Sequence, residues 1–185
     1  DQMAEMIDDI LARGRRQGKV MQVDINQLLR REIEFLKTNL EFKHGVECLL
    51  DLTPDLPTVK AVYSDLSQVF ENLLRNAVDA MHTSTYKQLT VRTLLKDDVI
   101  QVNIEDTGCG ISNEDIEHLF DPFYTTKPSI AEDAEPVGTG LGLYTVKTIL
   151  DRYHAKIDVV SQSEMGSEFR VSLTPFQPEG EHHAN

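Results

Sequence analysis

The sequence is poor in cysteine, in long apolar runs and in positive charge. Its two cysteines, Cys48 and Cys109, form no spacing motif, which is typical of free thiols in a reducing cytoplasm. No apolar run approaches the roughly 20 residues that a membrane helix needs, and no signal peptide opens the chain. We therefore expect neither a membrane-spanning nor a disulfide-rich protein.

Positive charge is scarce, because 18 lysines and arginines stand against 31 aspartates and glutamates, for a net charge of −13. Such a chain repels nucleic acid and anionic membranes, so neither is expected as a general partner. To bind a polyanion it needs a local device: backbone amides, a metal ion or a few placed cations. The 185 residues, 40% hydrophobic and 26% charged, suit one globular domain with some extra.

Residues 1–13 carry apolar side chains at helical spacing, but a short amphipathic helix is marginal alone. We interpret it as the tail of a longer helix or as an interface element, with a linker around Gly14 and Gly18. Because the chain begins at Asp1, we expect a longer parent protein.

Apolar periods of 3.6 or 2 residues predict the remaining elements. Helices are expected at 26–38 after a cap at Asp24, from a cap at Ser64 and Asp65 to Met81, at 112–120 and at 144–153. Strands are expected at 46–52, 59–62, 89–95, 100–104, 157–159 and 169–173. Residues 125–137 have no period, which is typical of a lid loop. This order predicts a two-layer α/β sandwich and not a Rossmann unit.

Three polar residues share one face of the long helix. Asn72, Asn76 and Asp79 follow one another at steps of four and three, opposite the apolar stripe. The ordinary explanation is the solvated side of an amphipathic helix. The alternative is a metal site, because asparagine is a poor helix former and its amide oxygen is a good ligand for a hard metal ion.

Glycine-rich turns occur at two later places. Asp106 ends a strand and precedes Gly108 and Gly110, so its carboxylate could accept from an exocyclic amine while the glycines let a flat ring approach. The alternative is a common Asp-Gly turn. Residues 138–143 alternate glycines at the start of a helix, whose amides and dipole favour phosphate, although such turns also occur where nothing binds.

Between these turns, residues 121–127 place two aromatics and a lysine at the mouth of the long loop. Phe123 or Tyr124 could anchor a lid, and Lys127 could reach a phosphate as a point charge. The alternative is a turn with ordinary packing aromatics.

Together these segments resemble the ATP-binding catalytic domain of sensor histidine kinases, in the wider gyrase, chaperone, kinase and mismatch-repair ATPase superfamily. The matching segments are 71–80 (N box), 106–111 (G1 box), 120–127 (F box), 138–143 (G2 box) and the pocket-closing strand 166–169. Four boxes in order, within about residues 24–175, are far more specific than one glycine motif. The Thr-Thr-Lys end of the F box is most like the nitrogen-regulation type, although loop 128–137 is longer and more acidic than that type leads us to expect.

The resemblance implies a Bergerat-type fold, with a mixed, largely antiparallel sheet under three helices, and ATP and Mg²⁺ as cofactors. Asp106 would bond the adenine amino group with help from Ser167 through water, and Asn76 would hold Mg²⁺. Asn76 and Lys127 would be the catalytic residues. The implied nucleotide-binding residues are Asn72, Asn76, Asp79, Asp106, Gly108, Gly110, Ile111, Phe123, Thr126, Lys127, Gly138, Thr139, Gly140, Leu141, Gly142, Leu143 and Ser167.

The phosphate acceptor in this family is a histidine on a separate helical hairpin, and four histidines of the chain lack its pattern: His44, His82, His118 and His154. The resemblance then divides the chain into the end of a dimerisation helix with its linker (1–19), a catalytic domain (20–177) and a tail (178–185). The implied partners are the parent's own dimerisation domain, within a homodimer, and a response regulator receiver domain. The implied location is cytoplasmic, including for a membrane-anchored parent.

Two alternatives stay open. A superfamily ATP hydrolase carries a glutamate four residues before the metal asparagine, to activate water. Here that position is Asn72, and Glu71 lies about 100° around the helix, which favours transfer. The other alternative is a degenerate nucleotide-binding regulatory module, against which the four intact boxes argue.

Overall fold

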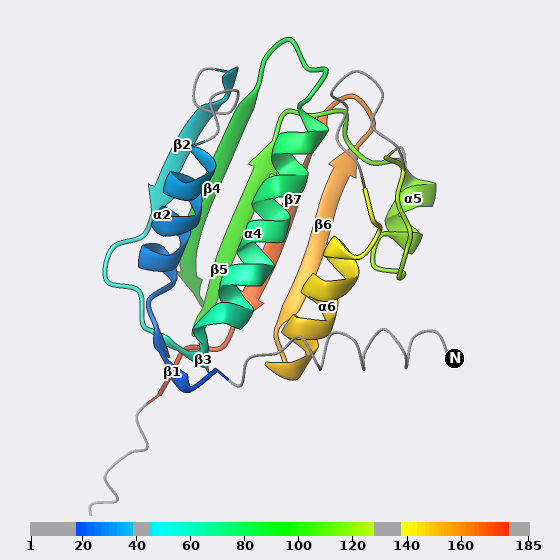
Figure 1. The fold of residues 1–185 in the computed structure, drawn as a ribbon. Coiled ribbons are helices and arrows are strands. Elements are labelled where there is room, and N and C mark those ends of the chain that lie inside the picture. The colour runs from blue at the N-terminus through cyan, green and yellow to red at the C-terminus, as the bar shows by residue number, and fades with distance from the viewer. Residues whose placement is uncertain (1–17, 39–44, 128–137, 178–185) are drawn as a thin grey trace, which may run out of the picture.

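The computed structural model describes residues 18–38, 45–127 and 138–177, which form a two-layer α/β sandwich (Figure 1). The strands are β1 (Val20–Val23), β2 (Glu47–Leu52), β3 (Val59–Val62), β4 (Gln88–Lys96), β5 (Val99–Asp106), β6 (Lys156–Gln162) and β7 (Gly166–Leu173). The helices within these ranges are α2 (Ile25–Leu36), α4 (Tyr63–Ala80), α5 (Asn113–His118) and α6 (Gly142–Arg152).

The main layer is a five-stranded sheet in the order β2-β4-β5-β7-β6, and α2, α4 and α6 lie side by side over one of its faces (Figure 1). The β2–β4 pair is parallel, whereas the other three pairs are antiparallel. The expected mixed, largely antiparallel sheet under three helices is therefore confirmed. The short helix α5 lies beside the sheet at the edge formed by β6 (Figure 1).

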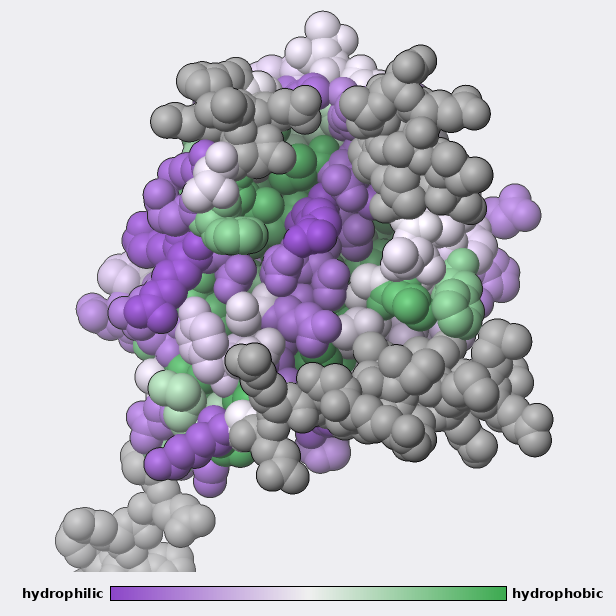
Figure 2. All heavy atoms as spheres, viewed as in Figure 1, coloured by the Kyte–Doolittle hydropathy of each residue, from purple (hydrophilic) through white to green (hydrophobic). Residues whose placement is uncertain are grey.

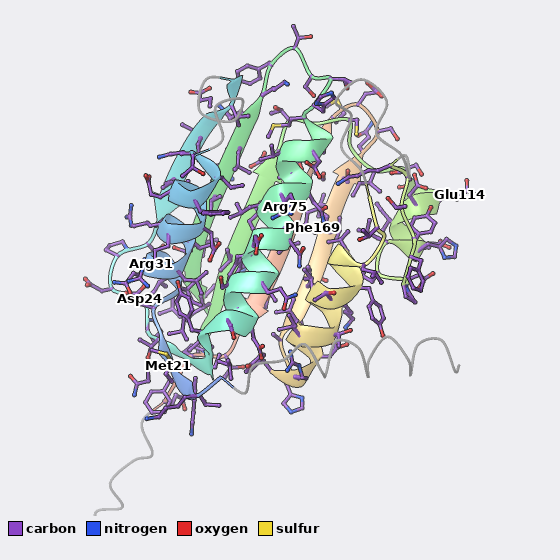
Figure 3. All side chains as sticks on the ribbon, in the orientation of Figure 1. Met21, Asp24, Arg31, Arg75, Glu114 and Phe169 are labelled. Carbon is purple, nitrogen blue, oxygen red and sulfur yellow. The ribbon has the colours of Figure 1, made fainter. Side chains whose placement is uncertain are left out.

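The core lies between α4 and the sheet. The apolar stripe of α4 is buried at Leu66, Val69, Phe70, Leu73, Leu74 and Ala77, as its period predicts. Alternate residues of β4, β5 and β7 face it, and Phe169, labelled in Figure 3, lies under the helices with 3% of its surface exposed. Burying such side chains stabilises a fold by about 1.5–3 kcal/mol each, so α4 is held in place over its whole length.

The β4–β5 hairpin forms where the alternation predicts it. Its turn residues Asp97 and Asp98 have φ of 50° and 56°. Two successive left-handed residues make the type of two-residue turn whose twist matches an antiparallel hairpin, and aspartate tolerates this conformation better than most residues do.

Of the helix caps expected at Asp24 and at Ser64 and Asp65, the first is present and the second is not. The Asp24 carboxylate accepts a hydrogen bond from the Gln27 backbone N–H at 2.9 Å and so caps α2. Ser64 and Asp65 do not cap α4, because that helix begins at Tyr63 and Asp65 already lies in its first turn. Asp65 instead accepts from the Tyr153 hydroxyl at 2.7 Å, which joins the start of α4 to the end of α6.

The strand β1 is absent from the sequence predictions. It pairs antiparallel with β3, from Val20 opposite Val62 to Val23 opposite Val59. Val20 and Met21 are about half exposed, so the segment shows no alternating pattern. Its partner lies some 40 positions away, and only the fold brings the two together.

Three expectations concern residues outside the described ranges: the N-terminal helix at 1–13, the lid loop at 128–137 and the tail at 178–185. Within the described ranges, no helix combines the length and the hydropathy that crossing a membrane requires.

Candidate active site

The candidate site begins at Asp106, the last residue of β5, which is only 3% exposed. Its Oδ1 accepts from the Gly108 backbone N–H at 2.8 Å, and its Oδ2 accepts from the Ser167 hydroxyl at 2.9 Å. Burial raises the pKa of Asp106, and the bonds from Gly108 and Ser167 offset part of that rise. Each carboxylate oxygen has a second lone pair, so the group can still accept from an exocyclic amine.

The loop after β5 is packed tightly between α4 and the β6–β7 hairpin. A Cβ on Gly108 would lie 2.6 Å from the Ala80 carbonyl oxygen at the end of α4. Gly110 has a φ of 69°, and a Cβ there would lie 2.0 Å from the Gln162 carbonyl oxygen. Both positions therefore exclude side chains, and the loop is more than a generic Asp-Gly turn.

The polar face of α4 is partly buried where a simple amphipathic helix would be solvated. Asn72, Asn76 and Asp79 are all of intermediate exposure. The Lys127 Nζ donates to Asp79 Oδ2 at 2.7 Å and to Asn76 Oδ1 at 3.3 Å. The side chains of Lys127 and Asp79 are 28% and 22% exposed, so this ion pair is partly shielded from solvent. The sequence does not predict this contact, since it joins residues about 50 positions apart.

The neighbouring face of α4 is fully polar and open. Figure 2 shows a hydrophilic band that follows this helix between more apolar regions. Arg75, labelled in Figure 3, lies on that band and pairs with Glu71 one turn away. Glu71 is therefore engaged away from Asn76, as the angular offset between the two positions predicts.

The first turn of α6 lies against the polar face of α4. A Cβ on Gly142 would lie 3.4 Å from Asn72 Oδ1. The N-cap residue Leu141 gives no side-chain hydrogen bond to the helix, while Leu143 packs on the core. The positive end of the α6 dipole is thus placed beside Asn72, a position that favours an anion.

A backbone hydrogen bond joins the segments on both sides of loop 128–137. The Phe123 N–H donates to the Gly140 carbonyl at 2.9 Å. Gly140 has a φ of 68°, and Phe123, with a φ of 65°, is unusual for an aromatic residue. A Cβ on Gly138 would lie 2.4 Å from Thr125 Oγ1, so the two segments are also in close contact at Gly138.

Of the two aromatics, Tyr124 is the one that is anchored. Its hydroxyl donates to Asp115 Oδ1 at 2.5 Å, and Asp115 Oδ2 accepts from Ser112, the cap of α5. The Phe123 side chain is 50% exposed. Thr126 and Thr139 are exposed as well, and the Thr139 hydroxyl accepts a hydrogen bond from the Leu141 N–H at 3.4 Å. Their expected part in nucleotide binding stays a prediction.

A metal at this site would rely on few protein ligands. Among the described residues, no three His, Cys, Asp or Glu side chains gather closely enough to hold an ion. Asn76 and Asp79 nevertheless bind a cationic group, the Lys127 ammonium, through an amide oxygen and a carboxylate oxygen. Oxygen ligands of this kind suit Mg²⁺, which commonly takes one or two protein ligands and completes its shell with phosphates and water. The residues present therefore fit the cofactor that the sequence implies.

Gly140→Ala tests the Phe123–Gly140 backbone hydrogen bond beside the lid loop. A Cβ there would lie 2.3 Å from the Phe123 carbonyl carbon, at a φ that alanine disfavours, so we expect the Phe123–Gly140 pairing to open. The affinity for ATP, measured by calorimetry, is expected to fall about tenfold, with the melting temperature little changed. Gly45→Ala is the matched control, because a Cβ at Gly45 meets nothing within 4 Å. Equal ATP affinities of the two variants would contradict a role for this hydrogen bond in nucleotide binding.

Known proteins resemble the chain in sequence. The profile of the family described as "Histidine kinase-, DNA gyrase B-, and HSP90-like ATPase" matches residues 61–177. Sporulation kinase E of Bacillus subtilis is 30% identical over 161 residues, which are 87% of this chain and 20% of that protein. The signal transduction histidine-protein kinase AtoS of Escherichia coli is 32% identical over 182 residues, or 97% of this chain and 28% of that protein. The chain thus spans less than a third of these relatives.

Among solved structures, full-length ShkA in complex with AMPPNP has the same fold, with a TM-score of 0.72 at 22% identity over 89% of this chain and 33% of that chain. The nitrogen-regulation type is not tested by these matches and stays a prediction. The matched residues 61–177 are more than half of the chain and contain α4, the loop after β5 and α6. On this evidence the chain belongs to the family of histidine kinase-, DNA gyrase B- and HSP90-like ATPases.

Proposed function

We propose that this chain binds ATP with Mg²⁺ and transfers the γ-phosphoryl group to a histidine on a separate dimerisation domain. The observation that carries the proposal is the cation contact of Asn76 and Asp79 with Lys127, one helical turn along α4 from Asn72, where α6 begins. It supplies what an acidic chain needs to hold a triphosphate: metal-binding oxygens, a movable cation and backbone amides. The named relatives, a sporulation kinase and a signal transduction histidine-protein kinase, support the same activity.

Each residue has a chemical part in this proposal. Asp106 accepts a hydrogen bond from the adenine amino group, and Ser167 holds the carboxylate that does so. Asn76 is the metal ligand, and a bound Mg²⁺ supplies neutralisation of phosphate charge. Lys127 exchanges its contact with Asp79 for a phosphate oxygen, while the first amides of α6 face the phosphates. These residues position the reacting groups and neutralise the phosphate charge, which is most of what phosphoryl transfer requires.

The reaction forms a bond from a histidine ring nitrogen to the γ-phosphorus and breaks the bond to the β–γ bridging oxygen, so that ADP leaves. The acceptor belongs to the parent's dimerisation helices. Residues 1–19 are the end of one such helix with its linker, 20–177 the catalytic domain and 178–185 a tail. We place the chain in a cytoplasmic homodimer that passes the phosphoryl group to a response regulator receiver domain. The relatives' greater length supports a multidomain parent.

The test is a mixture of this chain, the matching dimerisation helices and γ-labelled ATP. We expect acid-labile label on histidine that depends on Mg²⁺. Steady phosphate release without any acceptor would support a hydrolase instead, an outcome that the engagement of Glu71 with Arg75 argues against. The absence of any Mg²⁺-dependent thermal stabilisation by ATP would indicate a degenerate module.

A further inference from the structure

Ser161 lies on the same row of the sheet as the two polar residues of the adenine end. Asp106 of β5 pairs with Ser167 of β7, and Ser167 pairs with Ser161 of β6. Residues directly opposite one another on adjacent strands point to the same face, so these three side chains form one line across the sheet. Only the strand pairing shows this, because the sequence gives Ser161 no motif of its own.

The Ser161 hydroxyl makes two hydrogen bonds that join the hairpin to the loop after β5. It accepts from the Ile111 backbone N–H at 2.8 Å and donates to the Gly166 carbonyl at 2.8 Å. Ile111 is the last residue of that loop and directly follows Gly110. Ser161 therefore ties the exit of the loop to the turn from which Ser167 starts.

The rest of the loop is fixed by other groups. Its start is held by the Asp106 carboxylate through Gly108, and its middle by Cys109, whose N–H donates to Ala80 at 3.0 Å and whose carbonyl accepts from the Glu164 N–H at 2.6 Å. The exit is the one end that a side chain of β6 holds. Removing that side chain would leave the fold and the start of the loop in place.

We propose that Ser161 is a positioning residue, which holds the loop 107–111 at the distance from Asp106 that an adenine ring needs. The inference rests on the proposed function, since it assigns the adenine to this row. Gly110 is pressed against the hairpin, with Gln162 oxygen 2.0 Å from where its Cβ would lie, so a small shift of the hairpin moves the wall of the base pocket. Ser161 thereby contributes to the preference for an amino-bearing base without touching the nucleotide.

The experiment compares Ser161→Thr with Ser161→Val, which have nearly the same volume and both suit a strand, but differ in the hydroxyl. Calorimetry measures the Kd for ATP and for ITP, whose base carries a carbonyl in place of the amino group, each with Mg²⁺. We expect Ser161→Val to weaken ATP about tenfold and ITP less than twofold, while Ser161→Thr stays near the wild type. Ser163→Ala, an exposed serine of the same hairpin, is the control and should change neither Kd.

Several results would overturn the inference. Equal Kd values for the threonine and valine variants would show that the Ser161 hydroxyl does not affect nucleotide binding. A parallel loss of ATP and ITP binding would indicate only a structural role for Ser161. If the valine variant does not fold, rapid exchange of the Ile111 amide in the wild-type protein would contradict the bond on which the inference depends. Failure of the wild-type chain to bind ATP would refute the proposed function itself, and the inference with it.

Discussion

Asp106→Asn is expected to abolish adenine-dependent binding of ATP while the protein stays folded. An amide in this position can still accept from the Gly108 N–H through its oxygen and donate to the Ser167 hydroxyl oxygen through its nitrogen, so these two contacts are kept. It loses the second acceptor that the adenine amino group requires. A buried site that cannot pair its ligand's donor loses several kcal/mol, so calorimetry should show an affinity at least about a hundredfold lower.

The same substitution should not lower the melting temperature at neutral pH. Burial raises the pKa of Asp106, so the folded protein binds a proton there at a higher pH than the unfolded chain does. At neutral pH the buried charge costs stability, and this cost disappears as the pH falls through the raised pKa. The melting temperature of Asp106→Asn should therefore equal or exceed that of the wild type at pH 7, with the difference shrinking in acid.

The control for this prediction is Asp158→Asn, an exposed carboxylate on β6. It should leave the ATP affinity unchanged. A variant Asp106→Asn that binds ATP within threefold of the wild type would remove Asp106 from base recognition. A large fall in its melting temperature would mean that the carboxylate stabilises the fold, in conflict with the burial that raises its pKa.

Local patterns were sufficient for most of the fold. The α4 stripe and the alternation in β4 and β5 were predictable because each element packs one face, which fixes the period of its apolar residues. The Asp24 cap was predictable because its donor is three residues away. The start of α4 was not, since Asp65 is drawn into a contact with Tyr153 that sequence proximity does not suggest.

The candidate site divides in the same way. The positions of Asp106, Asn76 and the glycines follow from motifs that lie within single segments. The Lys127–Asp79 ion pair, the Phe123–Gly140 backbone bond and the Ser161–Ile111 bond each join separate segments. Spacing along the chain carries no information on such contacts, so they required the tertiary structure. They are also the contacts that distinguish a formed site from a set of separate sequence motifs.

Asn76→Asp is expected to remove Mg²⁺-dependent ATP binding and phosphotransfer. Asn76 already shares the Lys127 ammonium with Asp79, so an aspartate there would give Lys127 two carboxylates and hold it more firmly. It would also set a second negative charge toward the triphosphate. Two like charges about 4 Å apart repel by about 4 kcal/mol near a protein surface. Since about 1.4 kcal/mol is a factor of ten, we expect a loss of a hundredfold or more.

Although a carboxylate is a good metal ligand, the new aspartate would thus weaken Mg²⁺-dependent ATP binding. The neutral amide of Asn76 adds no negative charge beside the phosphates. Gln68→Glu is the matched control: it adds the same charge on the exposed face of α4, two turns before Asn76, and should change the ATP affinity less than twofold. Asn76→Ala separates the two effects, since it removes the oxygen without adding a charge, while Lys127 keeps its contact with Asp79. Its ATP affinity should become the same with and without Mg²⁺. If Asn76→Asp retains Mg²⁺-dependent binding within threefold, the metal ligand lies elsewhere, and Asp79, which contacts the same ammonium, becomes the residue to replace next.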